Sequence, residues 1–486
     1  MKKTLACLLV AAFVMLSFFA CNETVSENKK DETQDTSSAA ENISEDTNGR
    51  SEVDDLGEYD FKGHEFKIMN WTSPNQAFLD GRMGFEEETG DVYQDEIYRR
   101  NRRLEERFNI TISIKLVEGA GNPIMRTQLL ADGTEYDLYT QIMGISFGYA
   151  SEGLINEISR LKHIDLSKAY WDDFMNKQLT IANKKYFAVG AFDFTAYDLC
   201  YVVLANKQLL QTYGLEDPFN LVKSGKWTMD KFAEMCKTAT YDLDGDGKMT
   251  KNDAWGYVAR SSDVMPGLWC GAGVRASAHD GDDIPQNLMG TERFINVIDK
   301  IFDITWGQET YYNMFEFDMF TAGNTLFNDC SLHRLKYLRG METDFGILPY
   351  PKWDESQDRY YSRMAGSACY FTAKATSEEG LERTGVILEA MASDSYANVL
   401  PAYYETVLKT KLARDEESEK IIDMICANKV VDWVDAVWIG DFRDGPLDVM
   451  FKSKNNTLAS LNESKLAPLF IANCEKLVDM VMALED

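Results

Sequence analysis

An acidic loop at residues 242–253 constrains the fold most, because it must be held between two regular elements. Before the loop, Thr228 is a suitable N-cap for a helix whose apolar residues keep helical spacing as far as Ala239. Inside the loop, carboxylates stand at every second position before a glycine, which is the spacing that wraps a chain around calcium. After the loop, the alternating residues 254–259 predict a strand, and a strand in place of a second helix favours a structural metal over a sensing one.

The predicted cofactor is therefore a structural Ca²⁺. Lys248 would contribute its backbone carbonyl, and Asp253 takes the last position, where a bidentate glutamate is usual, so we expect weakened affinity. The alternative is an acidic turn that holds no metal. The predicted ligands are Asp242, Asp244, Asp246, Lys248, Thr250 and Asp253.

A helix that begins at Trp227-Thr228, an Asp-Gly-Asp-Gly loop and a strand containing Trp255-Gly256-Tyr257 follow one another in the chain. This order resembles the extracellular solute-binding proteins of bacterial ABC importers. The resemblance implies a two-lobed periplasmic-binding-protein-like fold of type II, with discontinuous lobes joined by hinge crossings. Predicted strands and helices alternate from His64 onward, which argues independently for the α/β class.

The same resemblance implies where the lobes divide. The first lobe would comprise residues 58–195 plus 346–395, and the second residues 196–345 plus 396–486, with the calcium loop in the second. We expect the chain to cross between lobes at residues 193–199 and again at 345–351. At the second place a short strand is closed by prolines, which suits an extended crossing.

Lys2 and Lys3 precede an apolar run that is too short for a comfortable bilayer span. This predicts a signal peptide over residues 1–20. Ala20-Cys21 resembles the lipobox of bacterial lipoproteins, which implies that Cys21 carries a lipid; ordinary cleavage is the alternative. Residues 21–57 contain few large apolar side chains and are expected to be a disordered tether. We therefore expect the protein in the cell envelope, at the outer face of the cytoplasmic membrane, held by its lipid alone.

The chain has 50 basic and 79 acidic residues, a formal net charge of −29. This charge repels phosphate backbones, so nucleic acid is not expected as a partner. No P-loop and no G-x-G-x-x-G sequence commits the chain to catalysis, and we predict that it is not an enzyme. A glycoside hydrolase needs only two facing carboxylates and stays open as an alternative.

Aromatic rings near expected strand ends favour a sugar ligand, because the C–H face of a pyranose stacks on an indole or phenol ring. For any single tryptophan the alternative is burial in the core. Asn70 is a weaker polar candidate, and Tyr403 and Tyr404 either line the site or pack a helix. The predicted ligand-binding residues are Trp71, Asp193, Tyr197, Trp269, Trp306, Arg334 and Trp438.

The resemblance implies a binding protein that captures an extracellular solute between its lobes and delivers it unchanged to the permease subunits of an ABC transporter. We interpret the solute as a mono- or oligosaccharide and expect the protein to be a monomer. Peptides, polyamines and other solutes remain alternatives. So does a surface glycan-binding lipoprotein that has no permease.

Overall fold

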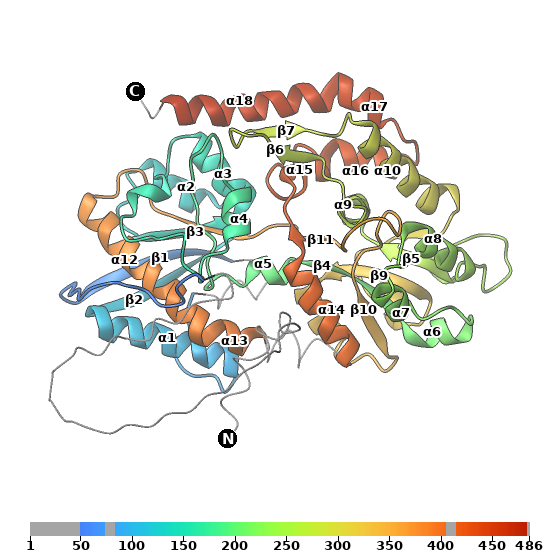
Figure 1. Ribbon diagram of the computed structural model, residues 1–486, viewed down its shortest axis with the longest axis horizontal. Coiled ribbons are helices and arrows are strands. Elements are labelled where there is room, and N and C mark those ends of the chain that lie inside the picture. The colour runs from blue at the N-terminus through green and yellow to red at the C-terminus, as the bar shows by residue number, and fades with distance from the viewer. Residues whose placement is uncertain (1–48, 73–82, 405–414, 484–486) are drawn as a thin grey trace, which may run out of the picture.

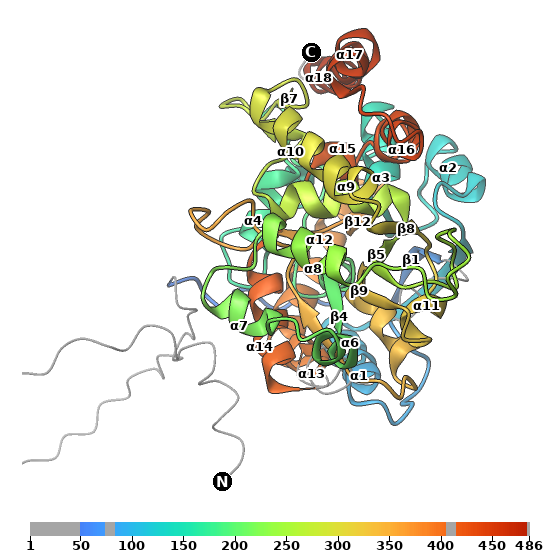
Figure 2. The ribbon, with the colours of Figure 1, turned by 90° about the vertical axis from the view of Figure 1, so that its right-hand side faces the viewer.

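The computed structural model of the chain describes residues 49–72, 83–404 and 415–483. Two β-sheets lie side by side, each with helices on its faces, and α18 extends from above α3 to above β7 (Figures 1 and 2). The chain is α/β, as the alternation of predicted elements indicated. Among the described segments, no helix has both the length and the apolar character of a bilayer span.

The first sheet has the strand order β12-β3-β1-β2. Strand β1 is parallel to β2 and β3, and β12 is antiparallel to β3. Side chains of β1 alternate between two apolar clusters: Phe66 and Ile68 face the cluster with α1 and α12, whereas Met69 and Trp71 face the other. The strands of this sheet are β1 His64–Thr72, β2 Ile110–Glu118, β3 Leu138–Ile142 and β12 Ala368–Phe371.

The second sheet has the order β10-β4-β9-β5-β8, in which β5, β8 and β9 are mutually parallel and β4 is antiparallel to β9 and β10. Strand β5 is the strand predicted after the acidic loop. The strands of this sheet are β4 Tyr201–Asn206, β5 Trp255–Ala259, β8 Tyr311–Asn313, β9 Thr325–Ser331 and β10 Phe345–Leu348. Two short ladders pair β6 Ser277–His279 with β7 Pro285–Asn287 and β11 Ser362–Arg363 with β13 Lys429–Val430.

Helices cover both sheets and connect their strands. In the first half of the chain they are α1 Val92–Phe108, α2 Pro123–Leu130, α3 Met143–Ser151, η2 Ile158–Arg160, α4 Asp173–Gln178, α5 Thr195–Asp198, α6 Lys207–Thr212, α7 Pro218–Lys223 and α8 Met229–Thr238. In the second half they are α9 Ser261–Gly271, α10 Glu292–Phe302, η3 Asp303–Gly307, α11 Asp318–Thr321, η4 Leu332–Leu338, α12 Glu378–Asp394, η5 Ser395–Val399, α13 Leu400–Tyr403, α14 Glu416–Ala427, α15 Trp433–Ala436, η7 Arg443–Leu447, α16 Asp448–Lys452, α17 Leu458–Leu461, η8 Asn462–Leu466 and α18 Ala467–Ala483.

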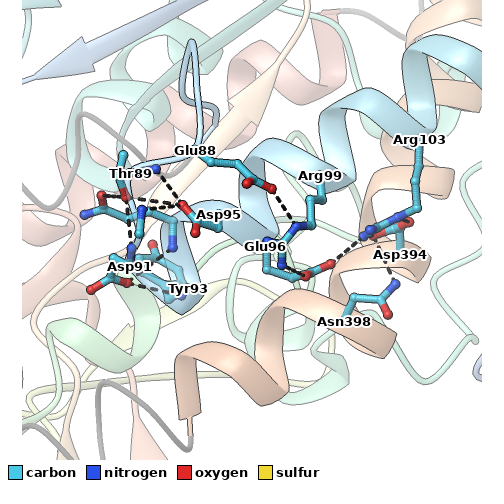
Figure 3. Close-up of polar contacts among 12 residues, drawn as sticks. Glu88, Thr89, Asp91, Tyr93, Asp95, Glu96, Arg99, Arg103, Asp394 and Asn398 are labelled. Atoms are coloured by element: carbon cyan, nitrogen blue, oxygen red, sulfur yellow. Dashed lines mark hydrogen bonds and ion pairs between the residues drawn. The ribbon is translucent and has the colours of Figure 1, made fainter.

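Helix α1 shows how local sequence sets an element and then fixes it in place (Figure 3). The carboxylate of Asp91 caps the helix by accepting from the Tyr93 N–H at 3.1 Å. Farther along, Arg103 donates through Nε to the Asp394 carboxylate at 2.7 Å, at the end of α12. This pair joins the two helices that cover one face of the first sheet.

The second crossing lies later in the chain than predicted. We expected residues 345–351 to lead back to the first lobe, but Phe345–Leu348 is strand β10, an edge strand of the second sheet paired with β4. The return occurs near residues 364–368, where the Ala365 N–H donates to the Leu199 carbonyl and the Met143 N–H donates to the Ser367 carbonyl. Proline after a strand did not distinguish a crossing from an ordinary strand end.

Two further boundaries differ from the prediction. Residues 49–57 do not all belong to a disordered tether, because Asp54 forms a bidentate pair with Arg107 of α1 at 2.7 and 2.9 Å. Residues 396–404 pack on the first lobe and not on the second: η5 and α13 contact α1, and the rings of Tyr93 and Tyr403 lie 5.1 Å apart. In both places side chains distant in sequence decide where the segment lies.

Candidate functional site

The two sheets present the carboxyl ends of their parallel strands toward each other. In the first lobe β1, β2 and β3 end at one edge, and β12 begins there because Ala368 pairs with Ile142. In the second lobe β5, β8 and β9 end at one edge, and β4 begins there because Tyr201 pairs with Ser331. The crossings at residues 193–199 and 364–368 join these two edges, which therefore face each other. In α/β proteins the carboxyl edge of the strands is where ligands bind.

Residues 433–444, called here the bridging segment, lie between the two edges. At the first edge, the backbone of the segment approaches Gly144 so closely that a Cβ atom there would lie 2.3 Å from the Val437 carbonyl oxygen. At the second edge, the Asp444 carboxylate lies 3.6 Å from the Arg260 guanidinium. The segment thus touches both walls of the region between the lobes.

A pocket of about 410 Å³ opens between the first edge, the bridging segment and α18. Trp438 is half-buried in its wall, with its ring against Trp433 and Phe470 at 5.3 and 4.9 Å. Polar groups are few, and Asn473 donates to the Asp441 carboxylate at 2.9 Å. The lining includes Ala120, Ile142, Gly144, Ile145, Phe147, Trp438, Gly440, Asp441, Asn473 and Lys476. An apolar wall with one tryptophan and a few polar groups suits a sugar-sized solute.

Asp193 and Tyr197 lie at the first crossing, beside a second pocket of about 540 Å³. Asp193 is buried and accepts from the hydroxyl of Ser367 at 2.6 Å and from the backbone and hydroxyl groups of Thr195. Since Ser367 belongs to the second crossing, Asp193 ties the two crossings together. Tyr197 is half-buried, with the Lys429 ammonium 5.5 Å from its ring centroid.

Tyr403 packs against helix α1 and the first crossing. It is buried, and its hydroxyl donates to the Asp198 carboxylate at 2.6 Å. Burial raises the pKa of Asp198 to about 7, although this hydrogen bond opposes the shift. Tyr404 is half-buried and donates to Asp423 at 2.6 Å. Asn70, also buried, accepts from the Thr140 hydroxyl at 2.5 Å and joins β1 to β3.

Three predicted tryptophans do not present a ring to the region between the lobes. Trp269 is 0% exposed and packs against Phe294 at 5.4 Å, so it is a core residue. Trp306 is half-buried in a pocket that also contains Trp255 and Tyr311, the first residues of β5 and β8, and it therefore lies at the edge opposite the site. Trp71 is near the end of β1 but only 4% exposed.

Arg334 lies at the second edge, in η4, and packs against two aromatic rings. Its guanidinium carbon is 3.7 Å from the ring centroid of Phe315 and 4.6 Å from that of Phe317. Sequence reasoning missed Phe315 and Arg260, which are at the same edge. The signal was available for Arg260, which directly follows the predicted strand 254–259.

The acidic loop brings three of its predicted ligands together. Carboxylate oxygens of Asp242, Asp244 and Asp246 lie within 4.8 Å of one another. Asp242 also accepts from the N–H groups of Gly245 and Gly247, both at 2.7 Å. Asp253 lies outside this group of three: its carboxylate accepts from the N–H groups of Leu243 at 3.0 Å and Thr250 at 2.6 Å. Lys248 is exposed and Thr250 is half-buried at the end of the loop.

Residues 144–148 read Gly-Ile-Ser-Phe-Gly and match the G-x-S-x-G pattern of a nucleophile elbow, which the prediction of no catalytic residue overlooked. An elbow serine stands exposed on a sharp turn. Ser146 is buried inside α3, and its hydroxyl donates to the carbonyl groups of Gln141 at 3.3 Å and Ile142 at 3.1 Å. The pattern therefore forms an ordinary helix here.

The sequence matches no protein-family model and no curated protein. The fold is similar to that of solved proteins. A cyclo/maltodextrin-binding protein in complex with maltotetraose aligns with a TM-score of 0.56 at 12% identity, over 87% of this chain and 97% of that one. An ABC substrate-binding protein from Listeria monocytogenes in complex with cycloalternan aligns with a TM-score of 0.51 at 12% identity, over 83% and 99%.

A third similar structure is UgpB from Mycobacterium tuberculosis in complex with glycerophosphocholine, with a TM-score of 0.52 at 14% identity, over 87% of this chain and 99% of that one. Each alignment spans nearly the whole of the solved protein, and so includes both lobes. The chain therefore has the two-lobed fold of the solute-binding proteins of ABC importers.

Proposed function

We propose that this protein is the solute-binding lipoprotein of an ABC importer, that it holds an extracellular carbohydrate between its lobes, and that it delivers this solute unchanged to a permease. The observation that carries the proposal is the pair of facing sheet edges with the half-buried Trp438 between them. Similar folds have been solved with maltotetraose and cycloalternan. A non-sugar solute is the second candidate, because another similar fold was solved with glycerophosphocholine.

A thermal-shift screen with mono- and oligosaccharides tests this proposal. A solute that binds only the native state raises the melting temperature by mass action, by more as its concentration exceeds Kd. Trp438→Ala should weaken binding of the best saccharide about tenfold, the loss expected for one stacked ring. Trp306→Ala is the matched control, since its ring lies at the opposite edge, and its affinity should equal that of the wild type. A screen in which only glycerophosphodiesters stabilise the chain would favour the second candidate.

The N-terminus supports attachment to the membrane through Cys21. The folded lobes are preceded by two lysines, an apolar run and Ala20-Cys21. The folded part begins near Asp54, whose carboxylate accepts from Arg107 of α1. We expect Cys21→Ala to abolish lipidation and to leave the protein in the soluble fraction. Mass spectrometry of the mature N-terminus checks this, and an unmodified residue at the mature end would contradict it.

The acidic loop supports a structural calcium held by Asp242, Asp244 and Asp246, with the Lys248 carbonyl, Thr250 and Asp253 completing the ligands. Three oxygens already lie close together, and a cation between them would relieve their mutual repulsion. After exhaustive dialysis against a chelator, added Ca²⁺ should raise the melting temperature, and Asp244→Asn should reduce that rise. Equal melting temperatures with and without Ca²⁺ would contradict the proposal.

A further inference from the structure

Two arginines and a phenylalanine meet where the second sheet faces the first lobe. Arg260 directly follows β5, Phe315 is the second residue after β8, and Arg334 lies in η4 after β9. Because these three strands are parallel, the residues come from the same edge of the sheet. The guanidinium carbon of Arg334 is 3.7 Å from the ring centroid of Phe315, and that of Arg260 is 5.7 Å from it. We call these three residues the arginine–phenylalanine cluster.

The cluster is accessible to a solute. Phe315 is 46% exposed and the Arg260 side chain is 44% exposed, whereas Arg334 is only 8% exposed. Arg334 also donates to the Phe315 carbonyl at 2.9 Å, and this hydrogen bond helps to fix the position of Phe315. An aromatic ring fixed by one cation and left open beside a second offers both an apolar face and hydrogen-bond donors.

The charge of the cluster is weakly paired. Arg260 faces the Asp444 carboxylate at 3.6 Å, and Arg334 faces Glu316 at 3.5 Å. Strong pairs of this kind are about 2.7–2.9 Å long. Within the described part of the chain the Arg260 guanidinium has no hydrogen bond, so its donors are free to take an outside acceptor.

A buried arginine in the same lobe provides the contrast. Arg363 is 0% exposed and bonds the two oxygens of Asp435 and one oxygen of Asp263, all within 2.9 Å. Its donors serve the fold. The chain as a whole carries a net charge of −29, which repels anions, so an anionic solute would need a local group of cations such as Arg260 and Arg334.

We propose that the arginine–phenylalanine cluster binds an anionic saccharide. The planar guanidinium of Arg260 takes the acidic group with two parallel N–H donors, and the Phe315 ring takes the C–H face of the same or the adjacent sugar. Uronate carboxylates and sulfate esters share this chemistry. The inference rests on the proposed function and deepens it, because it assigns an acidic class to the solute.

Isothermal titration of the full chain with matched oligosaccharides tests the inference. The probes are trigalacturonate, neutral galactotriose and neocarrabiose 4-sulfate, a disaccharide that carries a sulfate ester and no carboxylate. At least one acidic probe should bind tenfold or more tightly than galactotriose, and its affinity should fall as salt is raised. Binding of trigalacturonate but not of the sulfated disaccharide identifies a carboxylate site, and the reverse identifies a sulfate site.

Variants then locate the interaction. Arg260→Gln should weaken binding of the acidic probe about tenfold and change the affinity for galactotriose by less than twofold. Arg260→Lys should restore only part of the lost affinity, because an ammonium group lacks the two parallel donors of a planar guanidinium. Arg102→Gln is the control, since Arg102 is exposed above the Tyr98 ring on α1, away from the site. Melting temperatures of all variants verify folding.

The outcomes distinguish a wrong solute class from a wrong function. Equal affinities for acidic and neutral probes, or an unchanged affinity in Arg260→Gln, overturn the acidic solute class and leave the proposed carbohydrate function standing. If no saccharide of either kind binds the folded chain, the proposed function fails and the inference fails with it.

Discussion

Arg363 and Asp435 form a buried ion pair, with Nε and Nη2 each 2.7 Å from a carboxylate oxygen and neither side chain more than 1% exposed. Arg363 belongs to β11, just before the second crossing, and Asp435 to the bridging segment, where Arg443 contacts it at 3.1 Å. Since Asp263 of α9 also bonds Arg363 at 2.9 Å, the pair joins three parts of the second lobe. It holds the bridging segment in place beside the site.

Asp435→Asn should therefore destabilise the protein strongly. It removes a charge from a buried pair and leaves Arg363 and Arg443 undercompensated, which typically costs about 3–5 kcal/mol. Urea unfolding monitored by tryptophan fluorescence measures the loss. Asp358→Asn is the control, because Asp358 pairs with Arg359 on the surface and its removal should leave stability unchanged. Similar stability of the two variants would contradict a structural role for the buried pair.

Gly144→Ala should disturb the contact between α3 and the bridging segment. The added Cβ would lie 2.3 Å from the Val437 carbonyl oxygen, a backbone atom that cannot rotate away, and overpacking of this kind costs about 1–3 kcal/mol. Gly148→Ala is a matched control in the same helix, where no atom lies within 4 Å of the added methyl group, and it should be neutral or slightly stabilising. We expect urea unfolding to show a loss of stability for Gly144→Ala alone. Equal effects would show that the close approach is not required.

Asp329 should lower the stability of the protein as pH rises from about 4 to about 7. Burial raises the pKa of Asp329 to about 7, the nearby Asp263 carboxylate adds to the shift, and hydrogen bonds from Tyr257 and Tyr350, both 2.7 Å, oppose it. The unfolded chain releases this proton at about pH 3.9, so the native state binds more protons in this interval, and each such group lowers stability by up to about 1.4 kcal/mol per pH unit.

Asp329→Asn tests this pH dependence, because an amide oxygen still accepts from both tyrosines but does not titrate. Chemical denaturation at a series of pH values gives the slope of the free energy of unfolding against pH. For the variant this slope should correspond to about one bound proton fewer than for the wild type. Burial also raises the pKa values of Asp198 and Glu389 to about 7. These two buried groups should still contribute to the pH dependence of stability in the variant. An unchanged slope in the variant would mean that Asp329 is ionised throughout.

Solute binding should draw the lobes together about the crossings at residues 193–199 and 364–368. Contacts from both edges exist only when the lobes are close, so a bound solute shifts the population toward closure. Small-angle scattering should show a smaller radius of gyration with the best saccharide than without it. An identical scattering curve would favour a rigid surface glycan-binding protein.

Local patterns in the sequence determined the α/β class, the strand 254–259 and the acidic loop at 242–253. Each depends on residues close together in the chain: alternation places Phe66 and Met69 on opposite faces of β1, and the spacing of Asp242, Asp244 and Asp246 brings their oxygens within 4.8 Å. The order of these features resembles that of ABC-importer solute-binding proteins, and the two-lobed fold was predicted from that resemblance.

Only the tertiary structure decided which aromatic residues lie at the site and where the chain crosses between lobes. Trp269, Trp306 and Trp438 are equally plausible in sequence, yet one is in the core, one is at the far edge and one is in the wall of a pocket between the lobes. Likewise the sequence of Phe345–Leu348 predicts a strand but not its lobe, and pairing with β4 places it in the second sheet. The physical reason is that burial and strand pairing depend on partners distant in the chain. The free energy of these long-range contacts cannot be derived from the spacing of neighbouring residues.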